Sequence, residues 1–175
     1  TGDVRLQDAN LTSDGGAVVD VRDRTAGSIL ADSTGQLVAK NTPVGARIIN
    51  SDAAVTLWNL DATNNVDTGM AVHGGTGSTQ LMNSRIDGAS HGLRIRNLGG
   101  ALTVTEGIIQ TSGGTSALSV EGSDPVVQLT DVDVTGDGGS ALRVMNTTGG
   151  SVVADTTSSW TIQGGAPEGV YLENN

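Results

Sequence analysis

Pairs of apolar residues separated by a single residue recur at regular intervals along the chain. Apolar alternation with a period of two is the pattern of a β-strand that buries one face. The pairs are Val19/Val21, Ala46/Ile48, Met70/Val72, Leu93/Ile95, Leu118/Val120, Leu142/Val144 and Val170/Leu172. They predict a series of short strands that place equivalent residues on the same inward face.

Two further sets of apolar residues recur with the same spacing as these pairs, and each set is called a column here. In the first column, an apolar residue is followed two positions later by Asp, Asn or Glu: Leu6/Asp8, Leu30/Asp32, Leu57/Asn59, Leu81/Asn83, Val104/Glu106, Leu129/Asp131 and Val153/Asp155. The second column contains Leu11, Leu37, Ala62, Ile86, Ile109, Val134 and Trp160. Successive members are about 24 residues apart, and residues 4–38 also align with residues 127–161. The chain is therefore built from internal repeats.

The turns of each repeat also fall into columns. A small residue stands before nearly every strand pair, and a residue type that tolerates a left-handed turn follows it: Asp23, Asn50, Gly74, Asn97, Gly122, Asn146 and Asn174. One repeat cannot bury its apolar face, whereas stacked repeats form a continuous core. The prediction is an all-β fold, a right-handed single-stranded parallel β-helix (solenoid) of about seven coils. A β-sandwich or propeller is the alternative.

Composition narrows the possible partners and chemistry. The chain of 175 residues has 26 Gly, 3 Pro, no Phe and no Cys, and its net charge is -10. An acidic chain lacks the clustered cations that bind nucleic acid, so no nucleic-acid partner is expected. Disulfides and thiolate metal sites are excluded by the lack of cysteine. No apolar run is long enough to span a bilayer.

The repeat pattern resembles the passenger domain of a pertactin-type autotransporter, a bacterial surface adhesin family of type V secretion. Residues 154–162 resemble an A-D-x-x-S-x-W-T element of that family, and residues 169–174 resemble the strand that follows it. The resemblance implies a segment, residues 1–175, of a longer passenger domain with truncated ends. It also implies a location at the bacterial cell surface or outer membrane, or secretion. Membrane attachment is expected only through a barrel domain absent from this chain, and the uncapped sheet edges offer a route to self-association.

A column of carboxylates is the first candidate for chemistry. Stacking is expected to place Glu106, Asp131 and Asp155 on adjacent coils, with Asp133 near the same corner. Neighbouring carboxylates can hold Ca²⁺ or form a glycosidase pair. The alternative is that these side chains cap the turns by accepting backbone hydrogen bonds. We favour turn capping and expect no catalytic residue, no metal ligand and no cofactor.

A basic stripe is the second candidate. Arg94 and Arg96 alternate with Leu93 and Ile95, which points both guanidinium groups outward, and Arg143 occupies the same outward column two coils on. Arg85 and His91 belong to the same coil as Arg94. The candidate ligand-binding residues are Arg94, Arg96, Arg143 and His91, for a sulfated or carboxylated glycan. The alternative is that the arginines pair with carboxylates such as Glu121 on the next coil.

The histidines, the tryptophans and two longer segments favour a protein that presents binding loops rather than a catalytic site. His73 and His91 are expected to be isolated surface histidines, and Trp58 is expected to face outward while Trp160 faces inward. Longer segments at residues 38–44 and 161–168 are expected to form protruding loops that carry contacts. The predicted function is a non-catalytic adhesin module that binds a host-cell surface or matrix protein or glycan. A polysaccharide-degrading enzyme and a purely structural stalk are the alternatives.

Overall fold

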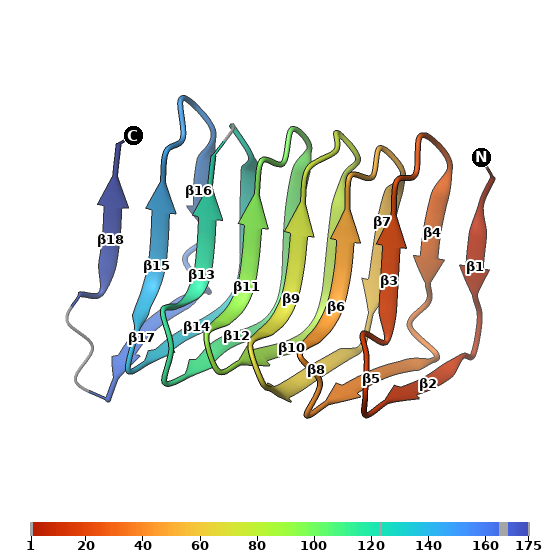
Figure 1. Cartoon of the computed structure of the whole chain (residues 1–175), viewed down its shortest axis with the longest axis horizontal. Helices are drawn as coiled ribbons and strands as arrows, with labels where there is room; N and C mark the ends of the chain where they lie inside the picture. Colours follow the sequence, from red (N-terminus) through yellow and green to blue (C-terminus); the bar gives the residue numbers. More distant parts are fainter. Residues whose placement is uncertain (1, 123, 165–167, 175) are drawn as a thin grey trace.

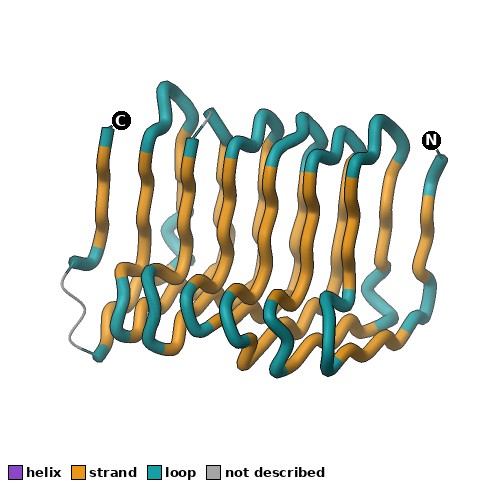
Figure 2. The backbone as a smooth tube through the Cα atoms, in the orientation of Figure 1, coloured by secondary structure: helices purple, strands orange, loops and turns teal. Residues whose placement is uncertain are grey.

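The computed structural model describes residues 2–122, 124–164 and 168–174, and these residues form only strands and turns. Parallel strands stack in coils about 25 residues apart and form a β-solenoid of about seven turns. The chain winds right-handed from one end to the other (Figure 1). The turns lie along the edges between the strands (Figure 2). No helix that could cross a membrane is found in the described parts of the chain.

The first sheet wraps around two sides of the solenoid (Figure 1). One side consists, in spatial order, of β1 (Val4–Leu6), β4 (Ser28–Ala31), β7 (Ala54–Trp58), β10 (Thr79–Gly88), β12 (Ala101–Ser112), β14 (Val126–Asp137) and β16 (Ser151–Ala154). The other side consists of β2 (Asn10–Ser13), β5 (Gln36–Lys40), β8 (Leu60–Asn65), the second halves of β10, β12 and β14, and β17 (Ser159–Gln163). The sheet bends at residues with positive φ, namely Asp8, Asn59, Asn83, Glu106 and Asp131.

The second sheet closes the third side. Its order is β18 (Val170–Glu173), β15 (Ser140–Met145), β13 (Ser116–Glu121), β11 (His91–Arg96), β9 (Thr68–His73), β6 (Val44–Ile49) and β3 (Val19–Arg22). All seven predicted apolar pairs lie in register here, so this column prediction is confirmed. The pairs from β9 to β13 are almost completely buried and form the centre of the core.

The column of turn residues that follows each pair is also confirmed. Asp23, Asn50, Gly74, Asn97, Gly122, Asn146 and Asn174 all have φ between 48° and 65°. Asp and Asn tolerate this left-handed conformation better than other residues with a side chain, because their short side chains hydrogen-bond locally. Side chains of successive coils also bond directly, for example from Asn174 Nδ2 to Asn146 Oδ1 over 3.1 Å.

The predicted first column is wrong by one residue in two coils. Ala31, rather than Leu30, pairs with Leu57, and Ala154, rather than Val153, pairs with Leu129. The predicted second column is wrong between the second and third coils as well. Leu37 pairs with Leu60, whereas Ala62 pairs with Ala39.

Longer turns between the first two strands of a coil cause these shifts. Asp32 and Asp155 do not adopt the positive φ of the bend residues. Each begins a wider turn and accepts bonds from the backbone N–H and the hydroxyl of a threonine two residues later, Thr34 or Thr157. The additional residues therefore change the register on the first sheet.

The predicted loop at residues 38–44 is also wrong. Residues 38–40 belong to β5 and Val44 begins β6, so only residues 41–43 form a turn. In the segment 161–168, residues 161–163 belong to β17, while residues 165–167 lie outside the described residues.

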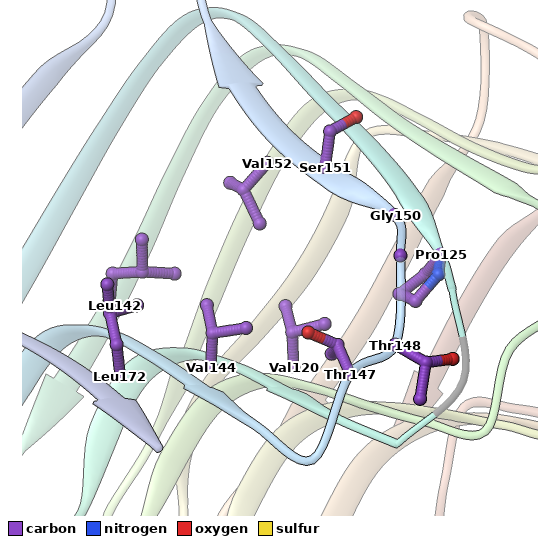
Figure 3. A pocket seen from close by; sticks show the side chains of 11 residues that line it. Val120, Pro125, Leu142, Val144, Thr147, Thr148, Gly150, Ser151, Val152 and Leu172 are labelled. Carbon is purple, nitrogen blue, oxygen red and sulfur yellow. The ribbon is translucent and has the colours of Figure 1, made fainter. Parts of the chain in front are cut away.

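An apolar hollow lies in the interior of the solenoid near its C-terminal end. This cavity of about 390 Å³ lies between β16 and the second sheet, and Figure 3 shows Val152 pointing across it toward the side of Leu142 and Val144. Val120 and Leu172 also line it. These valines and leucines belong to the inward columns, so the cavity is a loosely filled part of the core.

Candidate functional site

The outer face of the second sheet gathers most of the positive charge of the chain. Two columns of side chains point outward between the inward pairs: Asp20, Arg47, Ala71, Arg94, Ser119, Arg143 and Tyr171, and then Arg22, Ile49, His73, Arg96, Glu121, Met145 and Glu173. Within these strands the two columns hold five arginines and three carboxylates. The whole chain has nine Lys and Arg and a net charge of -10. We call these two columns the arginine face.

Arg94 and Arg96 share one carboxylate at the centre of this face. Arg94 Nη2 donates to Glu121 Oε1 over 3.3 Å, and Arg96 Nε donates to Glu121 Oε2 over 2.5 Å. Ser119 Oγ donates to Glu121 Oε1 over 3.2 Å. The expected pairing of both arginines with Glu121 is therefore confirmed. One carboxylate cannot neutralise two guanidinium groups, so the cluster keeps a net positive charge.

The arginines keep Glu121 ionised. Burial opposes ionisation of this carboxyl, but the hydrogen bond from Arg96 and the charges of Arg94 and Arg96 outweigh it, so the pKa of Glu121 is lowered. The cluster is thus a fixed, charged unit at neutral pH. Held in place by Glu121, the two guanidinium groups are ordered before any ligand arrives.

Arg143 borders a hollow two strands farther along the same column. Its guanidinium carbon lies 5.1 Å from the centre of the Tyr171 ring, and its Nε donates to Met145 Sδ over 3.0 Å. The hollow, about 380 Å³ in volume, is also lined by Glu168, Ser140 and glycines of the adjacent turns. No carboxylate among the described residues forms an ion pair with Arg143. A cation, an aromatic face and a hydroxyl therefore meet at one open hollow.

His91 does not belong to this face. Its side chain is only 7% exposed, and its Nδ1 is buried without a hydrogen-bond partner in the described structure. His91 begins β11 with the same parity as Leu93 and Ile95, in a column with Thr68, Ser116 and Ser140. The expectation of a surface histidine is therefore wrong for His91, because the strand begins at a covered corner of the solenoid.

The burial of His91 predicts a loss of stability in acid. Burial and, to a lesser extent, the charge of Arg94 lower the pKa of His91 from 6.5 to about 4. The unfolded chain therefore binds the proton more readily, so stability is full above pH 6.5 and is lost as pH falls toward 4. We expect about 2 kcal/mol less stability at pH 5 than at pH 7 from this group. Urea unfolding at both pH values measures it.

His91→Ser is the matched variant, since serine occupies the next position of the column at Ser116. The difference in stability between pH 7 and pH 5 should shrink by about 2 kcal/mol in this variant, whatever its absolute stability. An unchanged difference would show that other groups cause the acid sensitivity.

A second charged cluster on the arginine face was not predicted from the sequence. Asp20, Arg22 and Arg47 form a second cluster on β3 and β6. Arg47 lies in the column of Arg94, and Arg22 in that of Arg96. The outward position of Arg47 could have been predicted from the sequence. Arg47 stands between Ala46 and Ile48, just as Arg94 stands between Leu93 and Ile95.

The carboxylate column lies on the opposite side, at the bend of the first sheet. Glu106 and Asp131 are exposed bend residues, and they line a hollow of about 420 Å³ together with Asp133 and Arg85. Asp133 accepts a hydrogen bond from the Ser159 hydroxyl. Within the described ranges, no group of three or more acidic or histidine side chains is placed to hold a metal ion.

Asp155 acts as a turn cap. Its carboxylate accepts bonds from Thr157 and Ser158 and from the backbone N–H of Asp131, the last over 3.3 Å. The hydrogen bond from the Thr157 hydroxyl is the largest effect and outweighs desolvation; with the bonds from Ser158 and from the backbone N–H of Asp131, it lowers the pKa of Asp155 to about 2. A general acid of a glycosidase needs the opposite shift. Asp155 thus has the properties of a structural group.

The two tryptophans lie away from the arginine face. Trp58 is half-buried next to Met82 on the first sheet. Trp160 takes the inward position next to Val134 and is 37% exposed because no described coil stacks on its other side. No match to this chain was found among family models, curated proteins or solved structures.

Proposed function

We propose that this chain is a non-catalytic binding module that holds an anionic glycan on the arginine face. The observation that carries the proposal is the gathering of five of the nine basic residues on one outward face of an acidic chain. Guanidinium forks bind sulfate and carboxylate groups with two parallel hydrogen bonds. A flat sheet with fixed forks matches a ligand that presents such groups along its length.

The setting of this module is part of the proposal. A surface-exposed adhesin of the autotransporter type would use a rigid solenoid to display such a face to a host-cell or matrix glycan. The support for this setting is the repeat pattern and the resemblance of residues 154–162 and 169–174 to that family. Binding through the arginine face does not depend on it.

Binding to immobilised dextran sulfate, with neutral dextran as the blank, tests the proposal. The double variant Arg94→Ala/Arg96→Ala should bind dextran sulfate at least about tenfold more weakly, because charge-assisted hydrogen bonds are lost. The control is Arg5→Ala/Arg85→Ala, which removes the same charge from exposed positions on the first sheet.

The control variant should bind nearly as well as the parent chain. Equal weakening by the two double variants would mean that only net charge matters, and the arginine face would then have no special role. Absence of binding by the parent chain would remove the proposal altogether. Thermal unfolding of each variant establishes that the fold is intact.

A further inference from the structure

The arginine face contains two clusters of the same design. On β3 and β6, Arg22 donates to Asp20 from Nε over 2.8 Å and from Nη2 over 2.9 Å, and Arg47 Nη2 donates to Asp20 over 2.7 Å. On β11 and β13, Arg94 and Arg96 share Glu121 of the next strand, each donating to one of its carboxylate oxygens. Each cluster joins two guanidinium groups to one carboxylate and so carries a net positive charge.

Each cluster keeps guanidinium N–H donors that its carboxylate does not use. A guanidinium group has five N–H donors. The hydrogen bonds to Asp20 use three donors of Arg22 and Arg47, and those to Glu121 use two donors of Arg94 and Arg96. The Nε atoms of Arg47 and Arg94 are buried, so the donors open to a ligand are those at the exposed ends of the side chains. The side chains of Arg22 and Arg96 are 51% and 41% exposed, so they are accessible from solvent. The shared carboxylate holds the forks in place, which lowers the entropy cost of binding.

The two clusters lie in line along the solenoid axis. Three strand spacings separate their centres, which corresponds to about 14 Å at the usual distance between paired strands. Ile49, Ala71 and His73 fill the outward positions between them and add no carboxylate. Arg143 continues the line two strands beyond Arg94, about 10 Å farther along. The positive groups therefore form a straight, interrupted track across the strands.

We infer that the ligand is a linear sulfated or carboxylated polysaccharide that lies along the solenoid axis and contacts both clusters at once. This inference rests on the proposed function and adds the length and direction of the ligand. A single anion would bind only one cluster, and the carboxylate of that cluster already neutralises half of its positive charge. A chain that reaches both clusters gains from the high effective concentration of its second anionic group.

A single-stranded nucleic acid fits this track less well. Binding of unpaired bases depends on aromatic side chains on which the bases stack. Tyr171 is the one Phe, Tyr or Trp residue in the two outward columns of the described strands, and it lies beyond both clusters, beside Arg143. The imidazole of His73, between the clusters, is half-buried. The track thus offers charge and hydrogen bonds without stacking platforms.

The length of the ligand tests the inference. Affinities of a disaccharide and a dodecasaccharide of dextran sulfate are measured by calorimetry for the parent chain and for Arg22→Ala/Arg47→Ala. We expect the dodecasaccharide to bind the parent at least about thirtyfold more tightly than the disaccharide. The variant should lose most of this advantage, while its affinity for the disaccharide changes by about twofold or less.

Equal affinities of the two oligosaccharides for the parent, or an unchanged dodecasaccharide affinity in Arg22→Ala/Arg47→Ala, would overturn the two-cluster arrangement and leave the proposed function standing. Failure of the parent to bind either oligosaccharide would instead overturn the proposed function. Tighter binding of an oligothymidylate of similar charge than of the dodecasaccharide would overturn the choice of a polysaccharide.

Discussion

Replacing Leu93 with alanine should lower the free energy of unfolding by about 2–5 kcal/mol. Leu93 is completely buried and lies in the inward column between Met70 and Leu118 of the adjacent coils. The substitution removes buried methyl groups and leaves a cavity that the stacked strands on both sides cannot close. Urea-induced unfolding followed by circular dichroism measures the loss.

Leu172→Ala is the matched control for Leu93→Ala. Leu172 occupies an inward position of the same sheet, but it is 64% exposed at the last described coil. Its removal should cost less than about 1 kcal/mol, because little apolar area is taken out of a packed environment. Similar losses at the two positions would contradict the continuous core that runs through the middle coils.

Replacing Gly92 with alanine should destabilise the chain by about 3 kcal/mol. A Cβ atom at this position would lie 2.4 Å from the carbonyl oxygen of Gln110 and 2.7 Å from that of Ala117. Both contacts are with backbone of the next coil, which cannot move aside without breaking its own strand pairing. The two coils would have to separate locally. Thermal unfolding should show a clear decrease in Tm.

Gly15→Ala is the control, because a Cβ there meets nothing within 4 Å. The change in its stability should stay below about 1 kcal/mol. If Gly92→Ala were as stable as Gly15→Ala, the close approach of the coils at this corner would be wrong.

The second sheet could be predicted from the sequence because its spacing is nearly constant. Each apolar pair is followed at the same distance by a residue with positive φ, from Asp23 to Asn174. The glycine requirement at Gly92 could not be predicted in the same way, since Ala117 and Ala141 occupy the equivalent position. Whether a methyl group fits there depends on the distance to the next coil, which a sequence pattern does not contain.

The first sheet was predicted less accurately because two chemically similar turns have different lengths. Asp32 and Asn59 both follow an apolar residue by two positions, which suggested that they are equivalent. Asn59 makes a one-residue bend, whereas Asp32 opens a wider turn held by Thr34. An Asp followed two residues later by Thr was the available signal, and it also marks the turn at Asp155 and Thr157.

The candidate site could be predicted only in part. Alternation with Leu93 and Ile95 placed Arg94 and Arg96 outward, and the pairing with Glu121 followed from the repeat length. The burial of His91 could not be predicted from the alternation pattern. Whether a residue at the start of a strand is buried depends on how the neighbouring turn covers it.

The position of the ligand is the most direct test of the account. A chain of 17.6 kDa is within reach of amide NMR spectroscopy, and a titration with a sulfated dodecasaccharide reports which amides change. The account predicts that the largest shifts occur in β3, β6, β9, β11, β13 and β15, on the sheet that carries the arginine face. Shifts centred on Glu106 and Asp131 at the bend of the first sheet, or no shifts at all, would contradict it.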